Sequence, residues 1–172
     1  TLAGEQERLR ARLPPARWVR PHNQHLTLKF LGEVAVERLR ALSVDLAPAL
    51  APLAPVAVEM AGAGFFPNPR RPKVAWVGGR AEGATEVAAA VERVAVEHGF
   101  EAETRPWTLH VTQARLRRSW PTGAVRDYLR WGDGLVLERF VCREVVLFES
   151  QLSPDGAIYI PLERFELGCE VS

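Results

Sequence analysis

Two histidines in matching surroundings are the residues best suited to carry out chemistry. His25 opens the run His-Leu-Thr and His110 opens the run His-Val-Thr, so each imidazole is followed two positions later by a hydroxyl, that of Thr27 or Thr112. Because free imidazole has a pKa of about 6.5, one copy can act neutral as a general base while the other acts protonated as a general acid. Threonine hydroxyls can donate hydrogen bonds to phosphate oxygens as charge builds on them. The pattern predicts acid–base catalysis at a phosphate.

The two runs are parts of a longer repeat. Arg20-Pro21 precedes His25 and Arg105-Pro106 precedes His110, and the two copies are offset by 85 positions, since 110 − 25 and 105 − 20 agree. A residue before proline is pushed toward an extended conformation, so both histidines should enter their strands with similar geometry. The repeat predicts two pseudo-symmetric lobes. In-line displacement at phosphorus needs a proton donor and a proton acceptor on opposite sides, which two related strands would supply.

Sequence patterns for metal-assisted phosphate chemistry are missing around both histidines. Neither an aspartate cluster nor a Walker loop nor a two-metal carboxylate set lies near them, so imidazole is expected to activate water in place of a metal ion. Cys142 and Cys169 form neither a CxxC pair nor a Cys/His cluster, which argues against zinc and against a disulfide framework. The sequence predicts no metal, no cofactor and a reducing, cytoplasmic location.

The elements that must position the histidines are predicted to be half-buried strands. Residues 25–31 alternate between a polar face, with His25, Thr27 and Lys29, and an apolar face that includes Phe30, and residues 107–114 repeat the alternation. One histidine in such a strand is more often structural, and the second copy is what favours catalysis. The other two histidines, at positions 22 and 98, lack the repeat and are expected at the surface or at a helix end.

The rest of the chain alternates between helical and extended patterns. Helices are predicted over residues 4–13, 36–50, 85–98 and 124–131, the second one interrupted by Pro48. Strands are predicted over residues 56–60, 74–77, 139–149 and 157–165, with a loop at 65–72 and turns at 78–79 and 153–156. This order predicts an α+β or α/β fold, and a length of 172 residues with 47% hydrophobic content predicts one domain, residues 1–172.

Composition limits how the chain could meet a nucleic acid. The formal net charge is +1, so any RNA contact must be local. The arginines at 115, 117 and 118 follow the second histidine run and form either a solvated strand end or a phosphate contact, and Arg70-Arg71 could likewise contact an RNA backbone or form an exposed loop. No stretch approaches the roughly 20 apolar residues that a bilayer crossing needs, so no membrane partner is expected.

The paired runs HLTLKFLG and HVTQAR resemble the HxTx motifs of the 2H phosphoesterase superfamily, specifically its RNA 2′,3′-cyclic phosphodiesterases, also called 2′-5′ RNA ligases. The blocks Gly64-Phe65-Phe66-Pro67, Trp76-Val77-Gly78 and residues 149–159 are also similar to that family. The resemblance implies a bilobal α+β fold of antiparallel sheets with outer helices and a central cleft. It further implies hydrolysis of the 2′,3′-cyclic phosphate at RNA 3′ ends to a 2′-phosphomonoester by a metal-independent monomer, with 2′-5′ joining as the reverse reaction.

The resemblance also implies roles for single residues. His25 would donate a proton to the departing 3′ oxygen, and His110 would accept a proton from water. Thr27 and Thr112 would hold phosphate oxygens, and Arg115 would be a further anion contact. The aromatic residues should mostly be in the core, with Phe30 and Tyr159 as candidates to stack on the terminal base.

Two departures from the family pattern and two alternatives remain open. Gln113 stands where a hydrophobic residue is usual, and the chain opens with helix-like sequence where the family has an apolar strand. Either a segment upstream of Thr1 is absent from this sequence, which we favour, or the sheet of the first lobe is one strand short. The first alternative function is a non-catalytic protein that binds RNA ends. The second is a phosphodiesterase of the same fold that acts on another cyclic or 2′-linked nucleotide.

Overall fold

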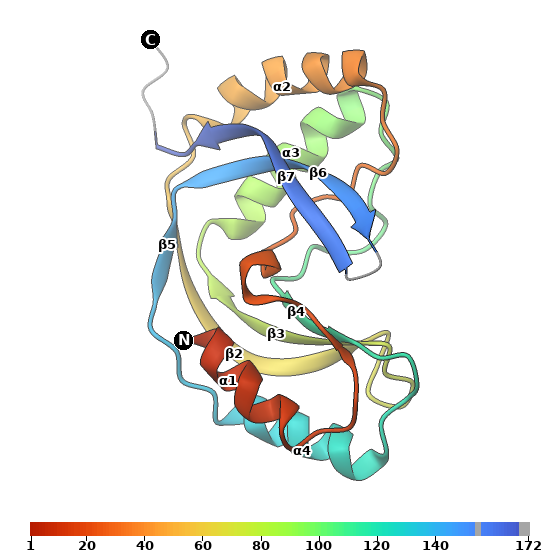
Figure 1. The fold of residues 1–172 in the computed structure, drawn as a ribbon. Coiled ribbons are helices and arrows are strands. Elements are labelled where there is room, and N and C mark those ends of the chain that lie inside the picture. Colours follow the sequence, from red (N-terminus) through yellow and green to blue (C-terminus); the bar gives the residue numbers. More distant parts are fainter. Residues whose placement is uncertain (154–155, 169–172) are drawn as a thin grey trace. The chain divides into compact units, whose positions relative to one another are not determined.

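Four α-helices and seven β-strands alternate along residues 1–153 and 156–168, the part of the chain that our computed structural model describes (Figure 1). The helices are α1 (Leu2–Arg10), α2 (Val36–Leu50), α3 (Ala84–Glu97) and α4 (Thr122–Asp133), and a 3-10 turn, η1, covers Pro21–Asn23. The strands are β1 (Arg17–Trp18), β2 (Val56–Phe66), β3 (Val74–Ala81), β4 (Val111–Arg115), β5 (Phe140–Cys142), β6 (Glu144–Ser153) and β7 (Gly156–Glu166). Within these residues, every helix is too short or too polar to cross a bilayer.

The strands form a five-stranded sheet in the order β1-β4-β3-β2-β5 and a separate two-stranded sheet, β6-β7. The β1–β4, β3–β4 and β6–β7 pairs are antiparallel. Segregated helices with antiparallel strands are the α+β arrangement, so the predicted fold class is confirmed.

The chain divides into two compact units. Unit 1 comprises Thr1–Leu26, Val58–Arg80 and Leu109–Phe140, and unit 2 comprises Thr27–Ala57, Ala81–Thr108 and Val141–Ser172. The chain first leaves unit 1 directly after Leu26, inside the first histidine run, and enters it for the last time at Leu109, directly before the second histidine. Both histidines and Thr112 therefore belong to unit 1, while Thr27 belongs to unit 2.

In unit 1, helices α1 and α4 cover one face of the sheet. The core on this face joins side chains from the two helices and the strands, namely Leu9, Phe65, Ala75, Ala114, Trp120, Val125 and Tyr128. The α4 helix lies very close to β2: a Cβ atom added to Gly132 would come within 2.2 Å of the Ala63 Cβ, so only glycine fits at this position without a shift. The opposite face of the sheet is the one that carries the histidine site.

In unit 2, helices α2 and α3 pack against each other, and α2 also contacts β7 (Figure 1). Their buried residues recur at three- and four-residue intervals, as in an amphipathic helix: Leu42, Leu46 and Leu50 in α2, and Val87, Val91 and Val94 in α3. The α2 helix continues through Pro48 to Leu50, so the predicted interruption at that proline is wrong.

The two predicted histidine strands differ from the structure. The segment 25–31 contributes an isolated antiparallel bridge at Leu26 in place of a strand, and β4 begins at Val111, after His110. The reason is that burial does not follow the expected alternation. The Lys29 side chain is 3% exposed because it pairs with Glu92, whereas Phe30, expected in the core, is 77% exposed.

Other boundaries moved for identifiable reasons. Gly78-Gly79 was expected to turn the chain but lies inside β3, where a Cβ atom on Gly79 would come within 2.4 Å of the Glu59 carbonyl oxygen. These glycines therefore allow neighbouring strands to approach closely. The β2 strand continues through Phe66, which shortens the predicted loop, and the predicted strand 139–149 is divided into β5 and β6. Ser153 pairs with Gly156, while residues 154–155 and Cys169 lie outside the described residues.

Candidate active site

The first histidine is oriented by the turn that precedes it. The η1 turn ends at Asn23, and the Nδ1 atom of His25 lies 2.8 Å from the Asn23 carbonyl oxygen. A carbonyl oxygen only accepts hydrogen bonds, so Nδ1 carries the proton and donates it. The ring atom that gains or loses the second proton is therefore Nε2. This contact gives His25, whose side chain is exposed, a defined tautomer and direction.

An antiparallel bridge aligns the two histidine runs. Leu26 pairs with Val111, the central residue of the second run. In antiparallel pairing, residues on either side of the bridge face each other and project from the same face, so His25 lies across from Thr112. His110 is then the diagonal neighbour of His25, with about 7 Å between their Cβ atoms in ideal geometry. That spacing leaves room for one phosphate group in contact with both imidazoles.

Aromatic residues from β2 and β3 pack beside His110. The ring of Phe66 meets the His110 imidazole edge-on, with centroids 5.0 Å apart, and contacts Trp76 at 5.3 Å. Trp76 pairs with Thr112 in the β3–β4 register. Its indole lies across Gly64, where a Cβ atom would come within 2.2 Å of the ring. The sequence blocks that contain Gly64, Phe66 and Trp76 pointed to the family, but their role beside His110 was not predicted from the sequence.

A β-bulge at Gln113 changes which side chains share the face of Thr112. Ala75 pairs with Ala114 and Trp76 with Thr112, so Gln113 is the extra residue on β4. Without the bulge, strict alternation would place Arg115 on the opposite face from Thr112. With the bulge, Arg115 pairs with Val74 and projects from the same face as Thr112, where its side chain is exposed.

Three glutamine amides lie under the paired histidine runs. Gln113 is fully buried, and its Oε1 accepts long hydrogen bonds from Gln24 Nε2 and Gln6 Nε2, both at 3.5 Å. Gln6, on α1, also donates to the carbonyl oxygens of Val19 at 2.9 Å and Gln113 at 3.2 Å. Gln24 precedes His25 and Gln113 follows Thr112, so the amides connect the two segments that carry the site.

In unit 2, the backbone of Thr27 is held by Trp107, whose Nε1 donates to the Thr27 carbonyl oxygen at 2.8 Å. Lys29 is not available for phosphate, because its Nζ lies 2.6 Å from Glu92 Oε2 and donates to the Glu101 carbonyl oxygen at 2.9 Å. The hydrogen bond from Lys29 lowers the pKa of Glu92, and the backbone N–H of Glu103 lowers it further against the effect of burial. Lys29 therefore stabilises the fold of unit 2.

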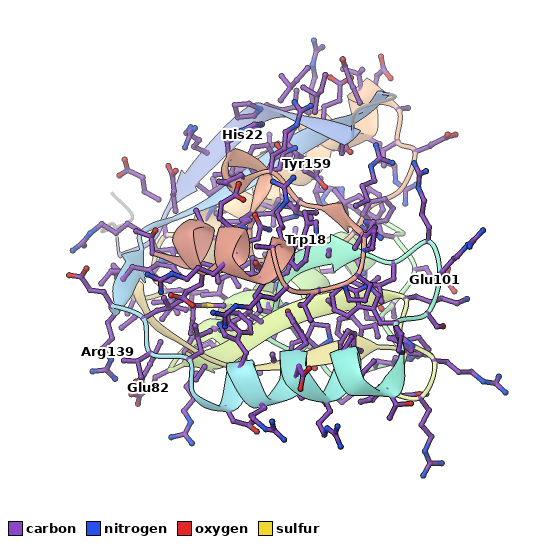
Figure 2. The ribbon with its side chains drawn as sticks, turned by 60° about the horizontal axis from the view of Figure 1, so that its bottom comes forward. Trp18, His22, Glu82, Glu101, Arg139 and Tyr159 are labelled. Atoms are coloured by element: carbon purple, nitrogen blue, oxygen red, sulfur yellow. The ribbon has the colours of Figure 1, made fainter. Side chains whose placement is uncertain are left out.

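The remaining predicted residues are divided between the two units. Tyr159 lies on β7 in unit 2, where its ring contacts Phe148 of β6 at 6.0 Å (Figure 2). Phe30 also belongs to unit 2. His22 is exposed on η1 in unit 1 (Figure 2), and His98 ends α3, where its Nε2 lies 2.8 Å from Asp45, as expected for surface and helix-end positions.

Within residues 1–153 and 156–168, no group of three or more histidine, cysteine, aspartate or glutamate side chains could hold a metal ion. Cys142 is a free, half-buried cysteine, and burial raises the pKa of its thiol.

Comparisons with known proteins agree with the geometry. The family model of LigT-like phosphoesterases matches residues 1–76. An RNA 2′,3′-cyclic phosphodiesterase of Archaeoglobus fulgidus is 34% identical over 149 residues, which cover 86% of this chain and 82% of the relative. A protein of the same name from Thermus thermophilus is 36% identical over 158 residues, which cover 87% of this chain and 74% of the relative.

Solved structures extend the likeness to the whole fold. A crystal structure of a Thermus thermophilus protein has a TM-score of 0.78 at 27% identity and covers 99% of this chain and 91% of that one. E. coli LigT in complex with 3′-AMP has a TM-score of 0.69 at 26% identity and covers 96% of this chain and 92% of that one. The resemblance seen in the sequence is confirmed, and the chain belongs to the LigT-like phosphoesterase family of the 2H superfamily.

Proposed function

We propose that this chain is an RNA 2′,3′-cyclic phosphodiesterase that opens the terminal cyclic phosphate to a 2′-phosphomonoester. The observation that carries the proposal is the bridge between Leu26 and Val111, because it sets His25 and His110 as diagonal neighbours on one face. The relatives that bear this name supply the substrate class. The proposal also assigns reversible 2′-5′ joining to the same residues, a reaction in which a 5′ hydroxyl attacks the cyclic phosphate in place of water, and it takes the active species to be a monomer.

In the proposed reaction, His110 accepts a proton from water while the water oxygen forms a new bond to phosphorus. The bond from phosphorus to the 3′ oxygen breaks, and His25 gives its Nε2 proton to that oxygen. The products are a 2′-phosphomonoester and a 3′ hydroxyl. His25 suits the donor role because its Nδ1 is engaged by the Asn23 carbonyl oxygen, so Nε2 is the atom that exchanges the catalytic proton.

Hydroxyl and guanidinium groups complete the proposed phosphate site. Thr112 lies across from His25, and its hydroxyl would donate to a non-bridging oxygen as negative charge develops. Thr27 is given the same role on its sequence motif, because it follows His25 at the spacing at which Thr112 follows His110. Arg115 is proposed as a further anion contact, since the bulge at Gln113 places it on the face of Thr112. Phe30 and Tyr159 remain candidates for stacking on the terminal base.

The proposal is tested by single-turnover incubation with an oligonucleotide that ends in a 2′,3′-cyclic phosphate, in the presence of excess EDTA. A 2′-phosphomonoester should form, and His25→Ala and His110→Ala should each lower the rate by about 10² to 10⁴. Near-normal rates in either variant would remove that residue's role. Binding without turnover would favour an RNA-end binding protein, and loss of activity in EDTA would contradict a reaction driven by imidazole alone. Sedimentation velocity tests whether the protein is a monomer in solution.

A further inference from the structure

The two units carry opposite charge, although the chain as a whole is nearly neutral. Unit 1 holds 15 of the 22 arginine and lysine residues and 6 of the 21 acidic residues, a formal charge of +9. Unit 2 holds the other 7 basic and 15 acidic residues, a formal charge of −8. A polyanion is therefore attracted to unit 1, the unit that contains both histidines, and repelled by unit 2.

Much of the positive charge of unit 1 lies in two stretches of sequence without any acidic residue, Met60–Arg80 and Leu109–Arg126. The first stretch includes the loop between β2 and β3, which carries Arg70, Arg71 and Lys73. The second includes the connection from β4 to α4, which carries Arg117 and Arg118. The side chains of all five residues are exposed. The two segments are joined by a hydrogen bond from the Leu116 N–H to the Lys73 carbonyl oxygen at 2.8 Å.

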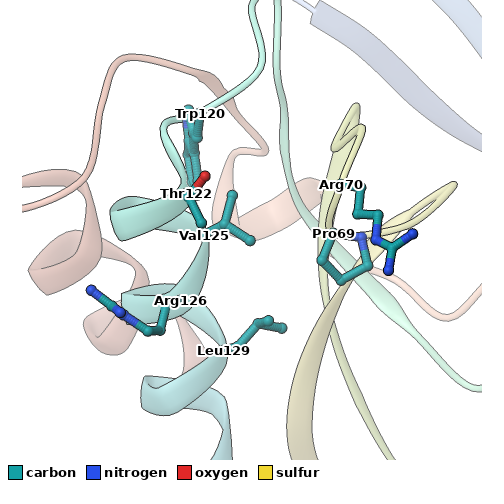
Figure 3. Close-up of a pocket in the computed structure, with 7 residues that line it drawn as sticks. All are labelled: Pro69, Arg70, Trp120, Thr122, Val125, Arg126 and Leu129. Atoms are coloured by element: carbon teal, nitrogen blue, oxygen red, sulfur yellow. The ribbon is translucent and has the colours of Figure 1, made fainter.

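A pocket of about 430 Å³ opens between these two stretches (Figure 3). Pro69 and Arg70 of the loop line one side, while Trp120 and the α4 residues Thr122 and Arg126 line the other. No ion pair engages the side chain of Arg70 or Arg126 within the described part of the chain. A volume of this size fits one nucleotide unit, with apolar walls for the sugar or base, while the exposed side chains of Arg70 and Arg126 extend outward at its rim (Figure 3), where their guanidinium groups could engage a phosphate.

The loop that carries Arg70 is held in place before any ligand binds. Asn68 Oδ1 accepts hydrogen bonds from the backbone N–H groups of Arg70 at 3.0 Å and Arg71 at 3.1 Å. The Lys73 N–H donates to the Phe66 carbonyl oxygen at 2.9 Å and closes the loop, which contains three prolines. Binding here would therefore cost little in backbone ordering.

The second stretch that lines the pocket also follows the second histidine run closely in sequence. Arg115 is three residues beyond Thr112 on the same face of the sheet, roughly 10 Å along the strand. The connection after Arg115 carries Arg117 and Arg118 and reaches the pocket wall at Trp120. Exposed basic side chains therefore occur along the sequence between Arg115, on the histidine face, and the pocket, whose wall residues Trp120 and Val125 belong to the core on the helix-covered face.

We propose that this pocket is a second subsite, which binds a backbone phosphate of the RNA strand upstream of the 2′,3′-cyclic end. The inference rests on the proposed function for the identity of the nucleic acid. It adds that the enzyme favours an oligonucleotide over a minimal cyclic-phosphate substrate, because only a longer strand can reach both sites.

The test compares the Arg70→Gln/Arg126→Gln double variant with the wild type and with a matched control, Arg40→Gln/Arg143→Gln, which removes two exposed arginines from unit 2. Binding of a labelled ten-nucleotide RNA that ends in a 3′-phosphate is measured by fluorescence anisotropy between 50 and 300 mM NaCl. Turnover is measured with a dinucleotide and a ten-nucleotide RNA, each with a 2′,3′-cyclic end.

The double variant should bind the ten-nucleotide RNA about 5- to 20-fold more weakly, and the magnitude of its salt slope should fall by about 0.7, the value for one lost phosphate contact on a single strand. Its kcat/KM for the dinucleotide should stay within twofold of the wild-type value, and the unit 2 control should match the wild type throughout.

Three results would overturn the subsite: a wild type that treats the two lengths alike, a double variant with unchanged affinity and salt slope, or a control that loses as much affinity as the double variant. Failure of the proposed hydrolysis is distinguishable, because turnover would then be absent from both substrates while the anisotropy measurement would still decide whether the pocket binds RNA.

Discussion

At the scale of single residues, the two histidines are not equivalent although their sequence runs match. His25 is exposed and directed by a carbonyl oxygen two residues before it, whereas His110 is half-buried against the edge of Phe66. A backbone acceptor that sets one tautomer suits a group that must present a proton at Nε2. An apolar ring beside the other imidazole restricts its orientation. The same side chain can therefore serve as proton donor in one position and as proton acceptor in the other.

The assigned roles predict which limb of the pH profile each histidine controls. Because a general base must be neutral and a general acid must be protonated, kcat/KM should be lower at acidic pH, where the base His110 is protonated, and lower at alkaline pH, where the acid His25 has lost its proton. The residual activity of His110→Ala should no longer decrease at acidic pH, and the residual activity of His25→Ala should no longer decrease at alkaline pH. The measurement is kcat/KM with a cyclic-phosphate dinucleotide from pH 5 to 9. A flat wild-type profile, or loss of the same limb in both variants, would contradict the assignment.

At the scale of elements, the site depends on the register of a very short pairing. The first histidine run has an isolated bridge, at Leu26, where a longer ladder would hold the register by repetition. Gln24 lies across from Gln113 on the helix-covered face, and their side-chain amides meet there. A shift of one residue would turn His25 away from Thr112, so this amide pair is well placed to resist such a shift.

The amide pair predicts non-additive effects of substitution. Gln113→Leu and Gln24→Leu should each destabilise the protein by about 1 to 3 kcal/mol, because each removes one partner of the hydrogen bond between the two amides. The double variant should regain much of that loss, since two apolar side chains can pack where two amides met. Urea unfolding and kcat would be measured for all four proteins of the cycle. Strictly additive losses in both quantities would show that the two amides do not act together.

At the scale of the whole molecule, contacts between distant parts of the sequence stabilise each unit. In unit 2, Lys29 joins the segment after the first histidine run to Glu92 on α3 and to the Glu101 carbonyl oxygen. The Lys29 side chain is 3% exposed, so loss of its carboxylate partner would leave a buried charge unpaired. The pair therefore fixes the segment that follows the first histidine run onto α3 within unit 2.

This ion pair predicts an acid-sensitive contribution to stability. Because the pKa of Glu92 is lowered on folding, its contribution is fully present above the ordinary carboxyl range and is lost as pH falls through the lowered value. Glu92→Gln should cost about 2 kcal/mol in urea unfolding at pH 7 and less at pH 3, because the wild-type carboxyl takes up its proton as the pH falls through its lowered pKa. Glu97→Gln, which removes an exposed pair with Arg93, should cost less than about 0.5 kcal/mol at both values. Equal losses at pH 7 and pH 3 for Glu92→Gln would contradict this account.

The sequence by itself determined the family and the α+β class, because a repeated pair of imidazole and hydroxyl groups can be recognised without any structure. It also determined most helices, whose apolar residues recur at the helical period and pack as that period requires. The alternation of polar and apolar residues over 25–31 predicted a strand that the structure does not have, because the Lys29 side chain is buried in an ion pair with Glu92.

Only the tertiary structure decided how the predicted groups come together. Three features depend on contacts between segments far apart in the chain. They are the bridge from Leu26 to Val111, the contact of the Phe66 ring with His110, and the pairing of β3 with β4, whose bulge brings Arg115 to the face of Thr112. The opposite charges of the two units likewise appear only when three separate stretches of sequence are grouped in space. Such contacts depend on strand register and on the packing of distant segments, which no local period in the sequence encodes.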